Sequence, residues 1–261
     1  MNVDYFQVDA FAARAFEGNP AGVCPLDVWL DDALMQSIAA ENNLAETAFF
    51  VAEGDDYRIR WFTPKLEVDL CGHATLATAA VLYEELDCKQ SEIRFHSRSG
   101  PLGVSRSESG YTLNFPLQEA QRCEVPQGLQ SALGITSAIS DCRLHEDYLI
   151  VIEDEAELRG LQPDFATINK IDARGVIVTS PAAEYDFVSR FFAPQVGIDE
   201  DPVTGSSFTK LAPYWAQRLQ QNRLQARQVS RRGGDVQCEV QGDRVLISGH
   251  ACCVLRGTFD L

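Results

Sequence analysis

The stretch Cys71-Gly72-His73-Ala74-Thr75 is among the most informative in the chain, because it places a glycine turn directly before an apolar helix. Residues 76–83 (LATAAVLY) are apolar on nearly every side, which is typical of a helix buried at the centre of a domain. The amino terminus of a helix presents unpaired N–H groups and the positive end of a dipole. This turn therefore predicts a site that suits a small carboxylate.

A second glycine turn, residues 201–207 (DPVTGSS), lies in the other half of the chain and opens a helix over residues 207–220. Pro213 falls inside that helix, so we expect it to kink the axis or shift the hydrogen bonds. Two such turns could bring two sets of N–H groups to one carboxylate.

Short strand-like segments surround both helices. In the first half they cover residues 3–11, 21–26, 46–51, 58–62, 93–95, 102–105 and 111–115, and a capped helix begins at Asp31 or Asp32 and runs to about Asn42. In the second half a short helix at 127–133 accompanies strands at 139–144, 148–153, 175–179, 187–192, 225–230, 236–241, 244–248 and 252–259.

The two halves share this order of elements. We therefore predict an α+β fold of two pseudo-symmetric domains, 1–117 and 118–261, each a mostly antiparallel sheet or barrel wrapped around a central helix. The last strand is a candidate to pack on the first domain. A Rossmann fold fits less well, because regular strand–helix alternation and a GxGxxG motif are missing.

Composition points to an ordinary globular protein. The 261 residues are 45% hydrophobic and 23% charged, and the net charge of −16 disfavours nucleic acid as a partner. No apolar run approaches the roughly 20 residues of a membrane span, and the first residues do not read as a signal peptide. We expect a cytoplasmic protein that does not bind membranes. The eight cysteines form no CxxC pair, so we expect free thiols and no metal site.

Three side chains of the first half are candidates for chemistry. Glu46 precedes an apolar run, where burial would raise its carboxyl pKa toward a range useful for proton transfer; a solvated glutamate at a strand end is the alternative that local sequence favours. His73 either faces a ligand or bonds to the backbone. Cys71 is either a reactive thiol at a helix start or a small buried side chain.

The second half and one turn of the first offer further candidates. Asp201, held extended by Pro202, either lines a ligand site or complements the helix amino terminus. Ser206 has the same two interpretations, and for Ser207 we prefer helix capping. Asn19 stands in a Gly-Asn-Pro turn of a common kind and carries little weight.

Five ordered segments make the chain resemble the phenazine-biosynthesis PhzF-like family of isomerases over nearly its whole length. They are residues 3–11 (VDYFQVDAF), 18–23 (GNPAGV), 43–49 (NLAETAF), 60–75 (beginning RWFTP and ending CGHAT) and 201–206 (DPVTGS). The resemblance implies a diaminopimelate epimerase-like fold with the active site in a cleft between two domains. It also implies a homodimer that uses neither a metal nor an organic cofactor.

The same resemblance implies roles for individual residues. Glu46 would be the general acid and base, and the substrate site would be lined by His73, Asp201 and Ser206. The reaction known in the family relocates a proton on a dihydro-hydroxyanthranilate. Diaminopimelate epimerase itself is a poorer match, because it uses one thiol at each glycine motif and Thr204 occupies the second position here.

The first hypothesis is therefore a cofactor-independent isomerase that moves a proton on a small carboxylate-bearing metabolite. Glu46 transfers the proton, and His73 and Asp201 orient the substrate and assist. The substrate-binding residues are Gly72, Thr204, Gly205 and Ser206. Two alternatives stay open: an amino- or hydroxy-acid epimerase that uses Cys71 or Glu46, and a metabolite-binding protein without catalysis.

Overall fold

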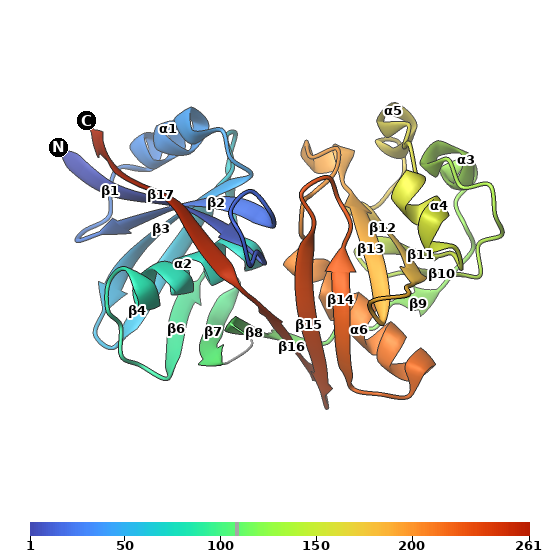
Figure 1. Ribbon diagram of the computed structural model, residues 1–261. Coiled ribbons are helices and arrows are strands. Elements are labelled where there is room, and N and C mark those ends of the chain that lie inside the picture. Colours follow the sequence, from blue (N-terminus) through green and yellow to red (C-terminus); the bar gives the residue numbers. More distant parts are fainter. Residues whose placement is uncertain (108–109) are drawn as a thin grey trace. The chain divides into compact units, whose positions relative to one another are not determined.

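The computed structural model describes residues 1–107 and 110–261, which form two compact units (Figure 1). Residues 1–114 and 248–261 make up the first unit, and residues 115–247 make up the second. Two strands begin in one unit and end in the other, β8 (Gly110–Pro116) and β16 (Arg244–Gly249).

The remaining elements divide between the units. The first contains β1 (Asn2–Ala10), β2 (Asn19–Leu26), α1 (Asp32–Asn42), β3 (Glu46–Glu53), β4 (Asp56–Phe62), β5 (Glu67–Val68), α2 (Gly72–Glu84), β6 (Glu92–Ser97), β7 (Gly100–Ser107) and β17 (Ala251–Asp260). The second contains β9 (Gln121–Arg122), α3 (Leu129–Leu133), β10 (Asp141–Leu144), β11 (Asp147–Val151), α4 (Glu155–Gly160), α5 (Phe165–Ile168), β12 (Gly175–Pro181), β13 (Phe187–Phe192), the 3-10 turn η1 (Pro194–Val196), α6 (Gly205–Leu219), β14 (Arg223–Gln228) and β15 (Gly234–Gln241).

Both units repeat one pattern of strand pairing. The first has the order β17–β1–β2–β3–β4–β6–β7–β8, in which β2/β3 and β4/β6 are parallel. The second has the order β9–β10–β11–β12–β13–β14–β15, in which β11/β12 and β13/β14 are parallel. A parallel pair needs a crossover connection, and each of these contains a helix: α1, α2, α4 with α5, and α6. The sheets are thus mostly antiparallel, as predicted, and the halves share a topology.

The outermost strand of the first unit comes from the end of the chain. β17 follows the second unit in sequence but pairs antiparallel with β1, from Asn2 opposite Asp260 to Ala10 opposite Ala251 (Figure 1, red beside dark blue). In the second unit the two-residue strand β9 takes the corresponding place beside β10. The strand at this edge of the sheet is therefore β17, from after the second unit, in the first unit, and β9, from directly before β10, in the second.

The two central helices, α2 and α6, are largely buried in their units. Every residue of α2 from His73 to Tyr83 is buried, which confirms the helix predicted from residues 76–83. In α6 the ring of Trp215 stacks on Phe187, with centroids 5.4 Å apart, and its Nε1 donates a hydrogen bond of 3.0 Å to the hydroxyl of Thr179. Burial of such aromatic rings contributes strongly to packing.

Pro213 shifts one hydrogen bond of α6 without ending the helix. A proline has no N–H, so the carbonyl one turn earlier, that of Thr209, loses its helical donor. The backbone N–H of Gln118 donates to that carbonyl at 3.1 Å, and the hydroxyl of Thr209 donates to the Gln118 side chain at 2.7 Å. Gln118, in the segment before β9, therefore supplies the hydrogen-bond donor that Pro213 cannot provide.

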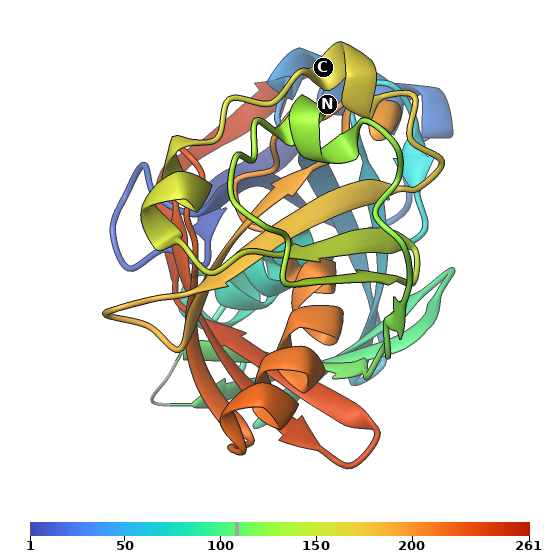
Figure 2. The same cartoon turned by 90° about the vertical axis from the view of Figure 1, so that its right-hand side faces the viewer.

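Helices cover the second face of each sheet. In the first unit, Met35 and Ile38 of α1 pack with Phe49 and Phe62. In the second, α3, α4 and α5 lie on the face of β10–β13 opposite α6, as the green and yellow helices in front of the strands and the orange helix behind them show (Figure 2). Coverage on both faces explains why β13 is buried along its whole length. No helix in the described part of the chain combines the length and apolar character needed to cross a bilayer.

Candidate functional site

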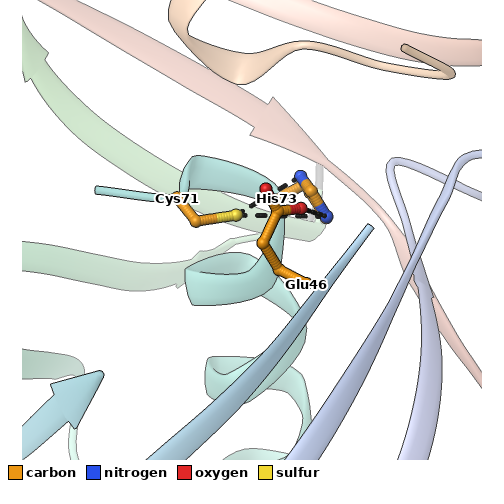
Figure 3. Close-up of side chains that lie close together, drawn as sticks. All are labelled: Glu46, Cys71 and His73. Atoms are coloured by element: carbon orange, nitrogen blue, oxygen red, sulfur yellow. Dashed lines mark hydrogen bonds and ion pairs between the residues drawn. The ribbon is translucent and has the colours of Figure 1, made fainter. Parts of the chain in front are cut away.

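Glu46, Cys71 and His73 lie together in the first unit (Figure 3). Glu46 is the first residue of β3, and Cys71 and His73 stand at the start of α2, one on each side of its first residue. The Oε2 atom of Glu46 is 3.3 Å from Nε2 of His73, and Sγ of Cys71 is 3.5 Å from Nδ1 of the same ring. The fold thus gathers three candidates from distant segments.

These side chains are largely removed from solvent. The side chain of Glu46 retains 12% of its exposure and that of His73 retains 7%. The prediction of a solvated glutamate at a strand end, which local sequence favoured, is therefore wrong. Burial lowers the pKa of His73 to about 3, because desolvation penalises the charged imidazolium. The imidazole is neutral at neutral pH, with one nitrogen that donates and one that accepts.

Asn19 is a member of this cluster that sequence reasoning missed. It is fully buried, and its Nδ2 lies 3.2 Å from Nδ1 of His73. With the amide nitrogen as donor, Nδ1 accepts and the ring proton sits on Nε2, directed at Glu46. The signal in the sequence was the Gly-Asn-Pro turn itself. In the structure Gly18 has a φ of +64°, and a Cβ there would lie 2.1 Å from the carbonyl oxygen of Ala10. The turn that places Asn19 therefore requires glycine.

The start of α2 suits an anion. Cys71 occupies the N-cap in an extended conformation, and within the described residues its side chain makes no capping hydrogen bond. A serine or aspartate at that position would occupy a first-turn N–H with its own oxygen. The Cys71 thiol makes no such bond to the residues that the structure describes. The N–H groups of Gly72 and His73 therefore lie at the positive end of the helix dipole, where they can stabilise a carboxylate.

The second unit arranges the other glycine turn in a comparable way. Thr204 is the N-cap of α6, and its hydroxyl donates to Oδ2 of Asp201 instead of accepting from the helix. Asp201 and Thr204 are both buried. Capping by Ser207 is a wrong prediction, because its hydroxyl donates to the carbonyl of Thr204 at 2.7 Å. The first residues of α6, Gly205 and Ser206, carry the N–H groups that point out of the helix start.

Gln228, at the end of β14, holds this turn in place and was also missed. Its side chain is fully buried. Its Oε1 accepts from the N–H of Thr204 at 2.9 Å, and its Nε2 donates to the carbonyl of Asp201 at 2.7 Å. The contact joins residues 24 apart in sequence for Thr204 and 27 apart for Asp201, so no local pattern marks it.

A buried ion cluster lies beneath the same turn. Nζ of Lys210 is 3.1 Å from Oδ2 of Asp147, and Arg174 donates to both oxygens of that carboxylate. Burial lowers the pKa of Lys210. Burial raises the pKa of Asp147, but the contacts with Arg174 and Lys210 outweigh it and hold that pKa below its usual range. Because Nζ also lies 3.5 Å from the carbonyl of Ser206, the cluster anchors the first turn of α6.

A cavity of about 680 Å³ in the first unit is separate from these residues. It is lined by the carboxyl-terminal half of α2 together with residues of β7, β8 and β17, and it contains no predicted site residue. Its two arginines already have partners: Arg106 pairs with Glu84 at 2.8 Å and Arg256 pairs with Glu85 at 2.6 Å. Cavity size alone therefore does not identify the candidate site.

Comparison with known proteins connects this geometry to a family. The family described as phenazine biosynthesis-like protein matches residues 8–257. The chain belongs to this family. An uncharacterized isomerase of Pseudomonas aeruginosa is 53% identical over 261 residues, covering 100% of both chains. A phenazine biosynthesis protein of the PhzF family from Enterococcus faecalis, known as a crystal structure, is 46% identical, with a TM-score of 0.97 and 100% coverage of both chains.

A more distant structure extends the likeness of fold. A predicted epimerase from Pseudomonas aeruginosa matches with a TM-score of 0.79 over 98% of this chain and 99% of that one, at 22% identity. At that identity the match concerns the fold alone. These findings confirm the predicted family and the predicted α+β, diaminopimelate epimerase-like fold of this phenazine biosynthesis-like protein.

Proposed function

We propose that this member of the phenazine biosynthesis-like family is an isomerase that relocates a proton on a small carboxylate-bearing metabolite, with Glu46 as the acid and base. The observation that carries the proposal is the contact of 3.3 Å between Oε2 of Glu46 and Nε2 of His73 in a buried setting. A carboxylate removed from water is a stronger base than one in solution, and a neutral imidazole beside it can donate a hydrogen bond.

The start of α2 supports the choice of a carboxylate-bearing substrate. Gly72 and His73 begin α2, and the His73 side chain contacts Glu46, so we infer that a carboxylate bound at this helix start would present its neighbouring carbon to the base. We assign Asp201, as a group that orients substrate, and the binding residues Thr204, Gly205 and Ser206 to the same reaction. Their support is the helix start that they form in the second unit.

The test begins with a thermal-shift screen of metabolites, followed by NMR of each hit in D₂O. We expect deuterium to enter a carbon of the true substrate in the presence of the wild-type chain. Glu46→Gln keeps the shape of the side chain and should abolish this exchange. Glu53→Gln, an exposed residue at the other end of the same strand, is the matched control. Undiminished turnover by Glu46→Gln would refute the assignment.

One observation favours a second candidate, an epimerase of amino or hydroxy acids. Sγ of Cys71 lies in the same cluster as Glu46 and could deliver or remove a proton. The same NMR experiment separates the two reactions. Deuterium at a new carbon with chirality retained indicates isomerisation, whereas loss of optical activity at one centre indicates epimerisation. In the second case Cys71→Ser should lose activity together with Glu46→Gln.

Two further proposals concern assembly. We propose a homodimer, following the resemblance to the PhzF-like family, and light scattering coupled to size-exclusion chromatography tests it through the mass in solution. We also propose that the chain has two domains with a boundary near residue 117. Limited proteolysis that cuts first within the segment 115–120 would support that boundary.

A further inference from the structure

We propose that Cys123 and Cys142 form an oxidation site, at which hydrogen peroxide converts two free thiols into a reversible disulfide. Their sulfur atoms lie 3.5 Å apart in the second unit, and both cysteines are free thiols. Sequence spacing did not mark the pair, because the two residues are 19 positions apart in the chain. The site is independent of the proposed proton transfer.

Strand pairing holds the two residues opposite each other. Arg122 on β9 is opposite Arg143 on β10, so the next residues, Cys123 and Cys142, also face each other. The N–H of Cys123 donates to the carbonyl of Cys142 at 3.0 Å. Opposite residues of antiparallel strands have Cα atoms about 4.5–5.5 Å apart, and disulfides span about 4.4–6.8 Å. Rotation of the two side chains can therefore bring the sulfurs to a bond length of about 2.0 Å without moving the backbone.

The surroundings give the two thiols different roles. Cys142 is 5% exposed, whereas Cys123 is half-buried and within reach of solvent. Burial raises the pKa of Cys142 to about 12, and the contact with Cys123 adds to this effect. Cys142 therefore stays protonated and can donate its S–H to the sulfur of Cys123. Cys123 is then the thiol that peroxide reaches, and Cys142 is the thiol that closes the disulfide.

The reaction balances with hydrogen peroxide as the oxidant. The sulfur of Cys123 attacks one peroxide oxygen, the O–O bond breaks, and a sulfenic acid and one water form. The sulfur of Cys142 then attacks that of Cys123, the S–O bond breaks, and the S–H proton leaves with the hydroxyl as a second water. Two thiols are oxidised to one disulfide, and one peroxide is reduced to two waters. A small thiol such as glutathione reverses the step by thiol–disulfide exchange.

The disulfide staples the edge of the second sheet. β9 is a two-residue strand beside β10, and the segment just before it carries Gln118, which donates to the carbonyl that Pro213 leaves without a helical donor. The closed loop contains α3, whose Leu129 and Leu133 pack in the same core cluster as Cys142. Oxidation should therefore protect β9 and its neighbours against local opening.

The test treats the reduced full-length protein with hydrogen peroxide, alkylates the remaining thiols after unfolding, and maps the peptides by mass spectrometry. Trypsin cuts after Arg122 and Arg143 and nowhere between them, so residues 123–143 form one peptide with both cysteines. We expect this peptide to lose two hydrogen atoms and to take up no alkylating reagent, and dithiothreitol should restore two alkylated cysteines. Hydrogen exchange at the amide of Cys123 should slow about tenfold or more in the oxidised protein.

Cys142→Ser separates the two roles. Without the second thiol, the sulfenic acid of Cys123 should persist and be trapped by dimedone. The control is Cys88→Ser, because Cys88 is half-buried like Cys123 and its sulfur lies 4.0 Å from the hydroxyl of Tyr57. That variant should form the disulfide in full, and circular dichroism checks the fold of each variant.

Two alkylated cysteines in the wild-type peptide, at a peroxide dose that oxidises free cysteine completely in a parallel sample, would overturn the site. A disulfide that joins Cys123 to a different cysteine or to a second chain would do the same. Neither result bears on whether Glu46 moves a proton, which the Glu46→Gln exchange experiment decides separately.

Discussion

Asn19 fixes the imidazole of His73 through a contact of 3.2 Å between its amide nitrogen and Nδ1 of the ring. Both groups are buried, so water competes little for either. The proton that this contact assigns to Nε2 faces Glu46. Asn19, which lies in an ordinary turn motif, thus determines which ring nitrogen of His73 donates a hydrogen bond.

The first prediction concerns that control. Asn19→Asp preserves the size of the side chain but makes it an acceptor, so the ring proton should move to Nδ1 and leave a lone pair of Nε2 facing the carboxylate of Glu46. We expect turnover to fall about tenfold or more, as for a lost hydrogen bond of about 1–2 kcal/mol. Nitrogen NMR of His73 reports the tautomer directly. An unchanged tautomer, or a loss of turnover matched by the exposed Asn222→Asp, would contradict it.

The second prediction is a pH dependence of stability. The pKa of His73 in the folded state is about 3, below the ordinary value of about 6.5 for the unfolded chain, because burial disfavours the charge. Between these values the unfolded state binds more protons, so the free energy of unfolding falls as pH falls, by up to about 1.4 kcal/mol per pH unit. Above pH 6.5 this contribution is complete.

His73→Gln should therefore flatten the stability profile below pH 6.5. The measurement is urea unfolding at pH 7, 6 and 5, with a chelator present in every sample. Carboxylates with lowered pKa values contribute mainly below this range, which isolates the histidine. Identical slopes for the wild type and His73→Gln would rule out a buried neutral imidazole.

The third prediction tests the anchor of the second glycine turn. Gln228→Glu cannot donate to the carbonyl of Asp201, and it places a second negative charge beside that residue. We expect a loss of about 1–3 kcal/mol in the free energy of unfolding and a raised KM, since the start of α6 would lose its position. Gln225→Glu, exposed on the same strand, is the control. An equal loss in both variants would show that the buried contact is unimportant.

The fourth prediction concerns the ion cluster beneath α6. Lys210→Met fills a similar volume but leaves the buried carboxylate of Asp147 with Arg174 as its one described cationic partner. Breaking a buried pair in this way costs about 3–5 kcal/mol. Lys170→Met, on an exposed residue, should change stability by less than about 0.5 kcal/mol. Urea unfolding compares the two, and equal midpoints would contradict the anchoring role.

The sequence predicted the parts of this protein whose signals are local. The run 76–83 predicted a buried helix, because a helix that is apolar on all sides must be buried, and this helix is α2. The strands expected at 46–51 and 58–62 are present as β3 and β4, which pair antiparallel from Thr47 opposite Phe62 to Glu53 opposite Asp56. The helices α4 and α5 were missed, because four to six residues are too few for a periodic pattern to emerge.

The contacts that build the site are not local. Asn19 and His73 are 54 residues apart, and their meeting depends on the turn before β2 and the start of α2 packing together. The four parallel strand pairs were likewise not visible, because alternation within a strand is the same whichever way its neighbour runs. Glu46 could be named from resemblance, but its burial depends on elements brought in from elsewhere in the chain.

The order in which the ribosome makes this chain has a consequence for its first unit. Residues 251–260 follow the whole second unit in the chain and are synthesised after it, yet they pair along the whole of β1. Until they emerge, β1 presents an open edge of N–H and C=O groups, which is a hazard for intermolecular pairing. The first unit therefore completes its sheet only after the second unit has been synthesised, and a nascent chain that stalls before residue 251 would be more prone to aggregate than one in which β17 has paired.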